Sequence, residues 1–253
     1  MIAGDLGLLA APMAAGLLVL ATHVPLGIEV LRRGIIFLDL AVAQMAALGM
    51  LVAHLLGWDA PDVAHGLGAQ LAAAVAAVLG ALLLTWCEKR WPQLQEALIG
   101  LLFVVAASAG ILLLADNPHG GEHLRDLLGG QILWVGWDRL PPLAAFYGLL
   151  LAAWFGLRER LGRAGFYLVF ALAVTASVQL VGVFLVFASL IAPAVASHAL
   201  RRGLVAAWVL GGLGYAGGLL CSLLADLPAG AAVVCALGLL AVLALLATRQ
   251  PAE

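Results

Sequence analysis

One acidic residue, Asp39, lies in a stretch of sequence that offers little other chemistry. Residues 35–56 are apolar or small apart from this carboxylate, one amide and one imidazole. A charged side chain that faces lipid costs roughly 2.5 to 3.5 kcal/mol on insertion scales, so such a residue usually turns toward water, a partner or a ligand. We therefore interpret Asp39 as part of a transport path. The alternative is that it pairs with Arg32 or Arg33 near the membrane surface.

A second group of possible ligands lies in the segment Asn-Pro-His-Gly-Gly-Glu-His. His119, Glu122 and His123 are spaced so that a single turn can gather two imidazoles and a carboxylate around one cation. Imidazole is also a common packing residue, and a solvated, glycine-containing loop is the alternative. His54 and His65 are candidates to continue an entry route.

The elements that must position these residues are membrane helices. Hydrophobic residues make up 65% of the 253 residues and charged residues only 10%. The apolar runs have the length of membrane-spanning helices, about 20 residues, whereas barrel strands alternate and need only about 10. The predicted fold class is all-α: a polytopic integral membrane protein with eight or nine transmembrane helices in a single domain, residues 1–253.

The orientation of these spans follows from the basic residues. The apolar runs cover approximately residues 7–31, 35–57, 67–86, 97–115, 140–157, 166–180, 182–199, 204–224 and 231–248. If the N-terminus starts outside, most of the lysines and arginines that flank these runs fall on one side, which the positive-inside rule assigns to the cytoplasm. We therefore predict an outside N-terminus and an inside C-terminus.

The stretch between Arg163 and Arg201 allows two interpretations. It is too long for one span of about 20 residues and short for two. Gly182 and Pro193 favour a broken pair of helices over one overlong helix.

Composition and motifs exclude several classes of function. The formal net charge of −2 argues against a nucleic-acid partner, which would require clustered Lys and Arg over a whole face. The phosphate-binding loop, the nucleophile elbow and the His-Glu-x-x-His helix are missing from the sequence. We therefore expect no enzymatic activity in this chain, and energy for transport must come from another chain or from an ion gradient.

Four segments carry a resemblance to a known family. They are Arg33-Gly34 with Phe37, Asp39 and Gly49; residues 122–140, EHLRDLLGGQILWVGWDRL; residues 181–202, VGVFLVFASLIAPAVASHALRR; and residues 226–230, DLPAG. In order and separation they resemble the membrane permeases of bacterial zinc- and manganese-type metal-uptake ABC transporters. The segment at 181–202 is the most specific match.

The first departure from the family pattern concerns the metal site. Where the family has an Asp and a His four residues apart, the matching positions here are Leu40 and Gln44, and the carboxylate stands one residue earlier at Asp39. The resemblance thus implies an altered metal site that uses Asp39 and Gln44. These two residues are about 140° apart on a regular helix. A π-bulge would bring them onto one face, and we take this as a hypothesis.

The second departure is the short loop predicted at residues 158–165, where the family usually has a longer acidic piece. The resemblance implies that cytoplasmic loops in this half dock the ATPase. Arg160, Gly162 and Gly165 are the candidate contacts. The alternative is a plain basic anchor at a helix end.

The resemblance implies a permease subunit in the bacterial inner membrane. It would form a homodimer with a second copy of itself, be supplied by a periplasmic or extracellular metal-binding protein, and be opened by a cytoplasmic ATPase subunit. No permanently bound cofactor is expected, because the divalent metal ion is the transported substrate. The imidazoles favour zinc slightly, and manganese and iron are the other candidates.

Three alternatives remain from the sequence. One is a secondary carrier in which Asp39 binds a proton or cation and a gradient supplies the work. Another is a permease for chelated iron or cobalamin. The third is a membrane scaffold in which Asp39 is a polar group for helix packing.

Overall fold

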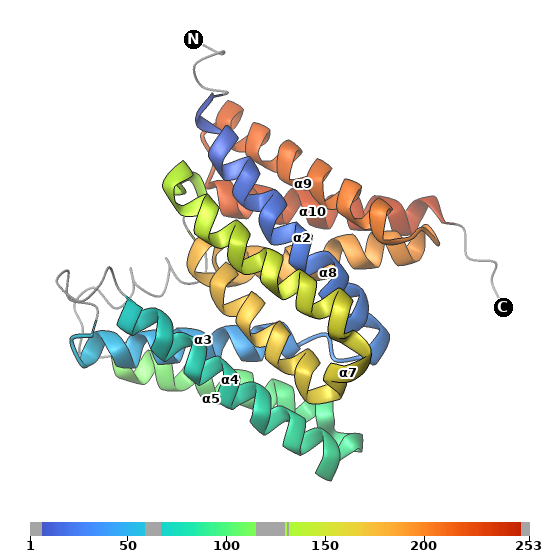
Figure 1. Ribbon diagram of the computed structural model, residues 1–253. Coiled ribbons are helices and arrows are strands. Elements are labelled where there is room, and N and C mark those ends of the chain that lie inside the picture. Colours follow the sequence, from blue (N-terminus) through green and yellow to red (C-terminus); the bar gives the residue numbers. More distant parts are fainter. Residues whose placement is uncertain (1–6, 59–66, 115–129, 131, 249–253) are drawn as a thin grey trace. The chain divides into compact units, whose positions relative to one another are not determined.

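The computed structural model describes residues 7–58, 67–114, 130 and 132–248, and these residues are almost entirely helical (Figure 1). The elements are α2 (Ala10–Arg33), α3 (Leu38–Leu55), α4 (Leu67–Arg90), η2 (Pro92–Leu94), α5 (Gln95–Leu114), η3 (Ile132–Trp134), η4 (Trp137–Arg139), α7 (Leu140–Val181), α8 (Val183–Ala199), α9 (Leu204–Ala225) and α10 (Ala229–Ala247). In this described part of the chain, eight helical segments are long and apolar enough to cross a membrane. The predicted all-α, multi-span fold is confirmed.

The helix pair between Arg163 and Arg201 is broken at Gly182. This residue has φ 82° and ψ 162°, a backbone conformation that glycine adopts without steric cost, and it separates α7 from α8. Pro193 does not contribute to the break, because α8 continues through it. A proline inside a membrane helix is tolerated when its neighbours satisfy the freed backbone groups.

A second break lies at Gly162, inside what is otherwise one continuous run of helix. Gly162 has φ 58° and ψ −153°, and it divides α7 into two membrane-length segments. The loop predicted over residues 158–165 is therefore wrong in extent, since the helix continues on both sides of this single residue. One glycine is sufficient because it alone supplies the positive φ that ends a helix.

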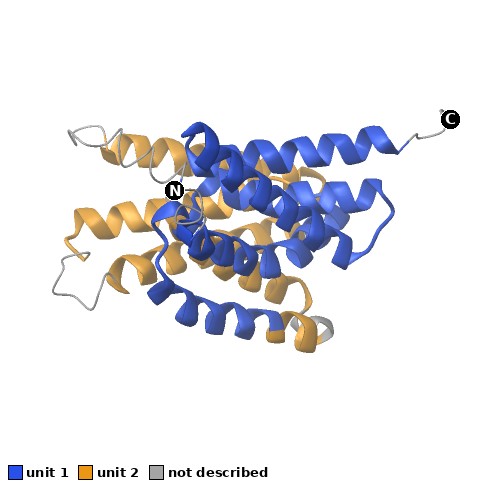
Figure 2. Cartoon of the chain, turned by 90° about the horizontal axis from the view of Figure 1, so that it is seen from above, with its two compact units in different colours: residues 1–34, 129–151, 180–253 blue, residues 35–128, 152–179 orange. Residues whose placement is uncertain are grey.

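The chain divides into two compact units, coloured separately in Figure 2. Unit 1 contains residues 1–34, 129–151 and 180–253, and unit 2 contains residues 35–128 and 152–179. The prediction that residues 1–253 form one permease domain stays a prediction.

In unit 1, α2 packs against α8 and α9, and α10 packs against the same two helices. Small residues permit this close approach: a Cβ on Gly27 would collide with the carbonyl oxygen of Leu190. Two polar contacts cross between helices. The indole of Trp208 donates to the carbonyl of Leu20 at 3.1 Å, and the hydroxyls of Ser189 and Tyr215 lie 2.7 Å apart.

In unit 2, α3 packs against α4 and α5. The approach of α4 to α3 again uses glycine, since a Cβ on Gly80 would lie 2.8 Å from the Cγ of Met45. The packing matters for the site because α3 carries both Asp39 and Gln44, and α4 and α5 hold this helix in position.

Candidate functional site

Asp39 lies in the first turn of α3 and is fully buried. Neither of its carboxylate oxygens has a hydrogen-bond partner among the described residues. A buried carboxylate without partners is costly, because it loses its hydration and gains nothing in return. A cation, a proton or water would remove that cost. The side chain therefore has the burial and the unused acceptor capacity of a ligand.

Gln44, the second residue of the implied metal site, lies on the same helix and is also buried. The π-bulge hypothesis is wrong, since α3 is α-helical from Leu38 to Leu55. At about 100° per residue, Asp39 and Gln44 thus lie about 140° apart around the helix axis. They flank α3 and do not stack on one face. Whether both contribute to one metal site stays a prediction.

The start of α3 is fixed by a residue that the sequence analysis did not consider. The backbone N–H of Phe37, at the N-cap of α3, donates to Oε1 of Glu96 at 3.3 Å. This bond satisfies one of the donors that a helix N-terminus leaves free. Glu96 thereby ties the first turn of α5 to the turn that carries Asp39. A polar pair at the start of an otherwise apolar run, Gln95 and Glu96, was the available signal.

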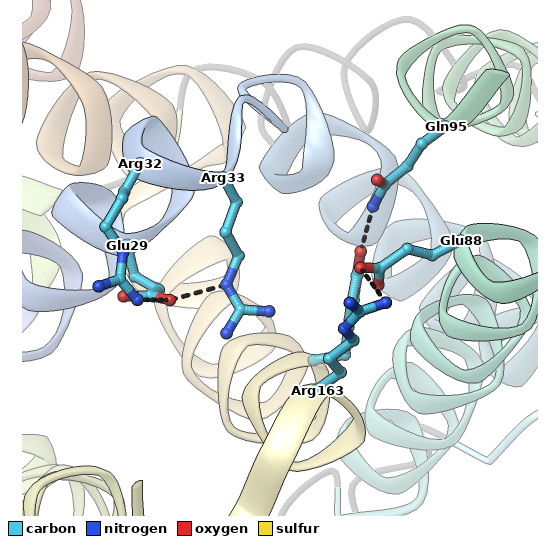
Figure 3. A network of polar contacts seen from close by, with 7 residues as sticks. Glu29, Arg32, Arg33, Glu88, Gln95 and Arg163 are labelled. Atoms are coloured by element: carbon cyan, nitrogen blue, oxygen red, sulfur yellow. Dashed lines mark hydrogen bonds and ion pairs between the residues drawn. The ribbon is translucent and has the colours of Figure 1, made fainter. Parts of the chain in front are cut away.

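Further polar contacts near Glu96 connect α5 and α4 to the second half of α7 (Figure 3). The amide of Gln95 donates to the hydroxyl of Tyr167 at 2.6 Å. Arg163 forms an ion pair with Glu88 at 3.4 Å. All of these residues belong to unit 2. Together with the bond from Phe37 to Glu96, these contacts hold the helices of unit 2 together at the end where α3 begins.

Glu29 forms two ion pairs with arginines of its own helix, α2. Arg32 and Arg33 both donate to Oε1 of this carboxylate, at 2.6 and 2.7 Å (Figure 3). The Glu29 side chain is only 3% exposed, so it is not a surface charge. The alternative pairing of Asp39 with one of these arginines is not found in the described structure.

We expect Glu29→Ala to destabilise the protein by about 2 kcal/mol, because removing one member of a buried pair leaves charges uncompensated. The cost is held below that of a fully buried pair because Arg32 is 65% exposed and Arg33 is 27% exposed. Thermal melting of the purified protein in detergent measures the effect. Arg33→Gln should lower the melting temperature more than Arg32→Gln. Equal effects of the two arginine variants would contradict this ranking.

The remaining sequence-predicted residues are His54, which is exposed in the last turn of α3, and two further sets. His119, Glu122, His123 and His65 lie outside the described residues. Of the candidate ATPase contacts, Arg160 and Gly162 are exposed and Gly165 is buried, all near the break in α7. Their role stays a prediction.

In the described structure, no three His, Cys, Asp or Glu side chains come together in a way that would hold a metal ion. A path with few ligands suits a transported cation, because selection requires partial dehydration and release requires weak binding.

A family comparison decides the class of the protein. The model of the ABC 3 transport family matches residues 6–162 and 143–248, which together include all eight candidate membrane spans of the described residues. The chain belongs to the ABC 3 transport family. The resemblance derived from the four sequence segments is thus confirmed, and this ABC 3 chain is a membrane permease whose ATPase is a separate subunit.

Two individual proteins are similar to this ABC 3 permease. The manganese transport system membrane protein MntC of Halalkalibacterium halodurans is 25% identical over 232 residues, covering 83% of this chain and 76% of that protein. The solved structure of PsaBC from Streptococcus pneumoniae in complex with Fab matches with a TM-score of 0.72 and 20% identity, covering 96% of this chain and 95% of that chain. The likeness to PsaBC, at 20% identity, shows a similar fold.

Proposed function

We propose that this ABC 3 permease carries a divalent transition-metal cation into the cytoplasm, driven by ATP hydrolysis on its partner subunit. The observation that carries the proposal is Asp39, a fully buried carboxylate within a membrane span whose two oxygens have no partner among the described residues. A dehydrated cation supplies the charge that this carboxylate lacks. The loss of hydration on both sides is then offset by their mutual attraction.

Manganese is the first candidate for the transported metal and zinc the second. The sequence-based preference for zinc rested on the imidazoles of His119 and His123. The buried donors on α3 are instead a carboxylate and an amide, whose oxygens suit manganese. The name of the relative MntC also favours manganese.

The proposed assembly follows from the family and from the distribution of charge. Two copies of the chain surround the route, a cytoplasmic ATPase binds below, and a periplasmic or extracellular metal-binding protein supplies the ion from outside. The N-terminus lies outside and the C-terminus inside, because the basic helix ends then face the cytoplasm.

Reconstituted uptake tests the proposal. Proteoliposomes that contain the permease with its ATPase and binding protein should accumulate Mn²⁺ on addition of ATP, and Zn²⁺ more slowly. Vesicles that lack the ATPase should accumulate neither metal. Uptake that proceeds without the ATPase and follows an imposed ion gradient would contradict the proposal and support a secondary carrier. ATP-driven uptake of Zn²⁺ in preference to Mn²⁺ would reverse only the choice of metal.

A further inference from the structure

One face of α4 is exposed along the whole length of the helix. Leucine and valine side chains recur on it every three or four residues, the spacing of a single helix face. The exposed members are Leu71, Val75, Leu79, Leu82 and Trp86. Because α4 is long and apolar enough to cross the membrane, this exposed apolar face has the length and composition that suit contact with acyl chains.

The apolar face ends in a pair of tryptophans. The rings of Trp86 and Trp91 lie 5.2 Å apart, centroid to centroid, with their planes at 89°. Such an edge-to-face arrangement is a favourable geometry for aromatic rings. Both side chains remain accessible, with 54% of Trp86 and 41% of Trp91 exposed. Tryptophan is enriched at the boundary between acyl chains and headgroups, so this pair marks the depth at which α4 leaves the hydrocarbon.

Positive charge is concentrated beside the tryptophan pair. The guanidinium carbon of Arg90 lies 5.8 Å from the centre of the Trp91 ring, within the range of a cation–π contact. The neighbouring Lys89 is exposed. The adjacent carboxylate, Glu88, forms an ion pair with Arg163. In the described structure, neither Lys89 nor Arg90 forms an ion pair with a carboxylate, so their charges are available to a ligand.

We propose that Trp86, Lys89, Arg90 and Trp91 form a binding site for the headgroup of an anionic phospholipid. The two cationic side chains bind the phosphate, with Arg90 held in place by stacking on Trp91. The acyl chains lie along the exposed face of α4 that begins at Trp86. Charge complementarity selects an anionic lipid over a zwitterionic one, and the tryptophans place the phosphate at the depth of the interface.

Native mass spectrometry of the detergent-purified protein, titrated with phosphatidylglycerol or phosphatidylcholine, tests this site. The wild-type protein should bind phosphatidylglycerol more tightly than phosphatidylcholine. The double variant Lys89→Gln, Arg90→Gln should weaken phosphatidylglycerol binding about 30-fold, because each cation near a membrane surface contributes roughly a factor of five. The variant Trp86→Leu, Trp91→Leu should weaken binding of the anionic lipid while leaving both charges in place.

A matched control removes the same charge elsewhere. Arg201 and Arg202 are an exposed basic pair that follows α8, and Arg201→Gln, Arg202→Gln should leave the tightest phosphatidylglycerol site intact. Wild-type affinity in the Lys89, Arg90 variant, or equal binding of both lipids by the wild-type protein, would overturn the proposal. A tryptophan variant that changes the mass of the assembly without changing lipid affinity would also overturn it, because the α4 face would then be a contact between copies of the chain.

Discussion

Asp39→Asn is expected to abolish metal uptake while leaving the protein folded. The substitution keeps the shape of the side chain and removes the negative charge that compensates a dehydrated cation. Transport should fall about 100-fold or more, since every 1.4 kcal/mol of lost interaction is roughly tenfold. The melting temperature should stay the same or rise, because a buried carboxylate without partners becomes a neutral amide. ATP-driven uptake in proteoliposomes and thermal melting in detergent measure the two effects.

The matched control for this variant is Asp226→Asn. Asp226 is exposed and lies at the end of α9 in the left-handed region, with φ 50°. Asparagine tolerates this conformation as well as aspartate does, so the exchange changes only the charge. Uptake by this control should match the wild type. Normal uptake by the Asp39 variant would remove the carboxylate from the transport path and favour a role in helix packing.

Gly27→Ala is expected to cause a large loss of stability in unit 1. A Cβ at this position collides with the backbone carbonyl of Leu190, which cannot rotate away as a side chain can. Separating α2 from α8 should destabilise the protein by about 3 kcal/mol, the upper end of the cost of overpacking. Thermal melting in detergent gives the measurement.

Gly217→Ala is the control for the glycine series. Gly217 lies in α9 of the same unit, and outside its chain neighbours and the adjoining helix backbone no described atom lies within 4 Å of the position that its Cβ would take. Alanine is a better helix former than glycine by about 1 kcal/mol, so this variant should be as stable as the wild type or slightly more stable. If both variants melt like the wild type, close contact at Gly27 is not needed for the packing of α2.

The sequence predicts the spans well because lipid leaves the chain few options. Every backbone polar group within the bilayer must be satisfied internally, so long apolar runs become helices. The break at Gly182 was predictable because a glycine interrupted a stretch too long for one span. Around Gly162 the sequence predicted a loop over residues 158–165. The charged residues of this segment are typical of a connection between helices, and they do not reveal that helix continues on both sides of Gly162.

The candidate site also combines features that the sequence predicts with contacts that only the structure reveals. The burial of Asp39 follows from its residue type in an apolar run, and the Glu29 pairs follow from spacings of three and four residues along one helix. A polar residue in an apolar run can be noticed, but the sequence does not indicate which distant residue it contacts. Phe37 and Glu96 are 59 residues apart, and Gln95 and Tyr167 are 72 residues apart, so only the packed structure reveals them.

The two units are interleaved along the chain, and this arrangement imposes an order on biosynthesis. Unit 1 takes its first helix, α2, from the start of the chain and its last three helices, α8 to α10, from residues after 180, whereas all of unit 2 lies between residues 35 and 179. As the polypeptide emerges from the ribosome, α2 therefore enters the bilayer long before its packing partners exist. Until α8 and α9 are inserted, the carboxylate of Glu29 therefore depends on Arg32 and Arg33 of its own helix for its ion pairs. Unit 2 has by then received all of its segments.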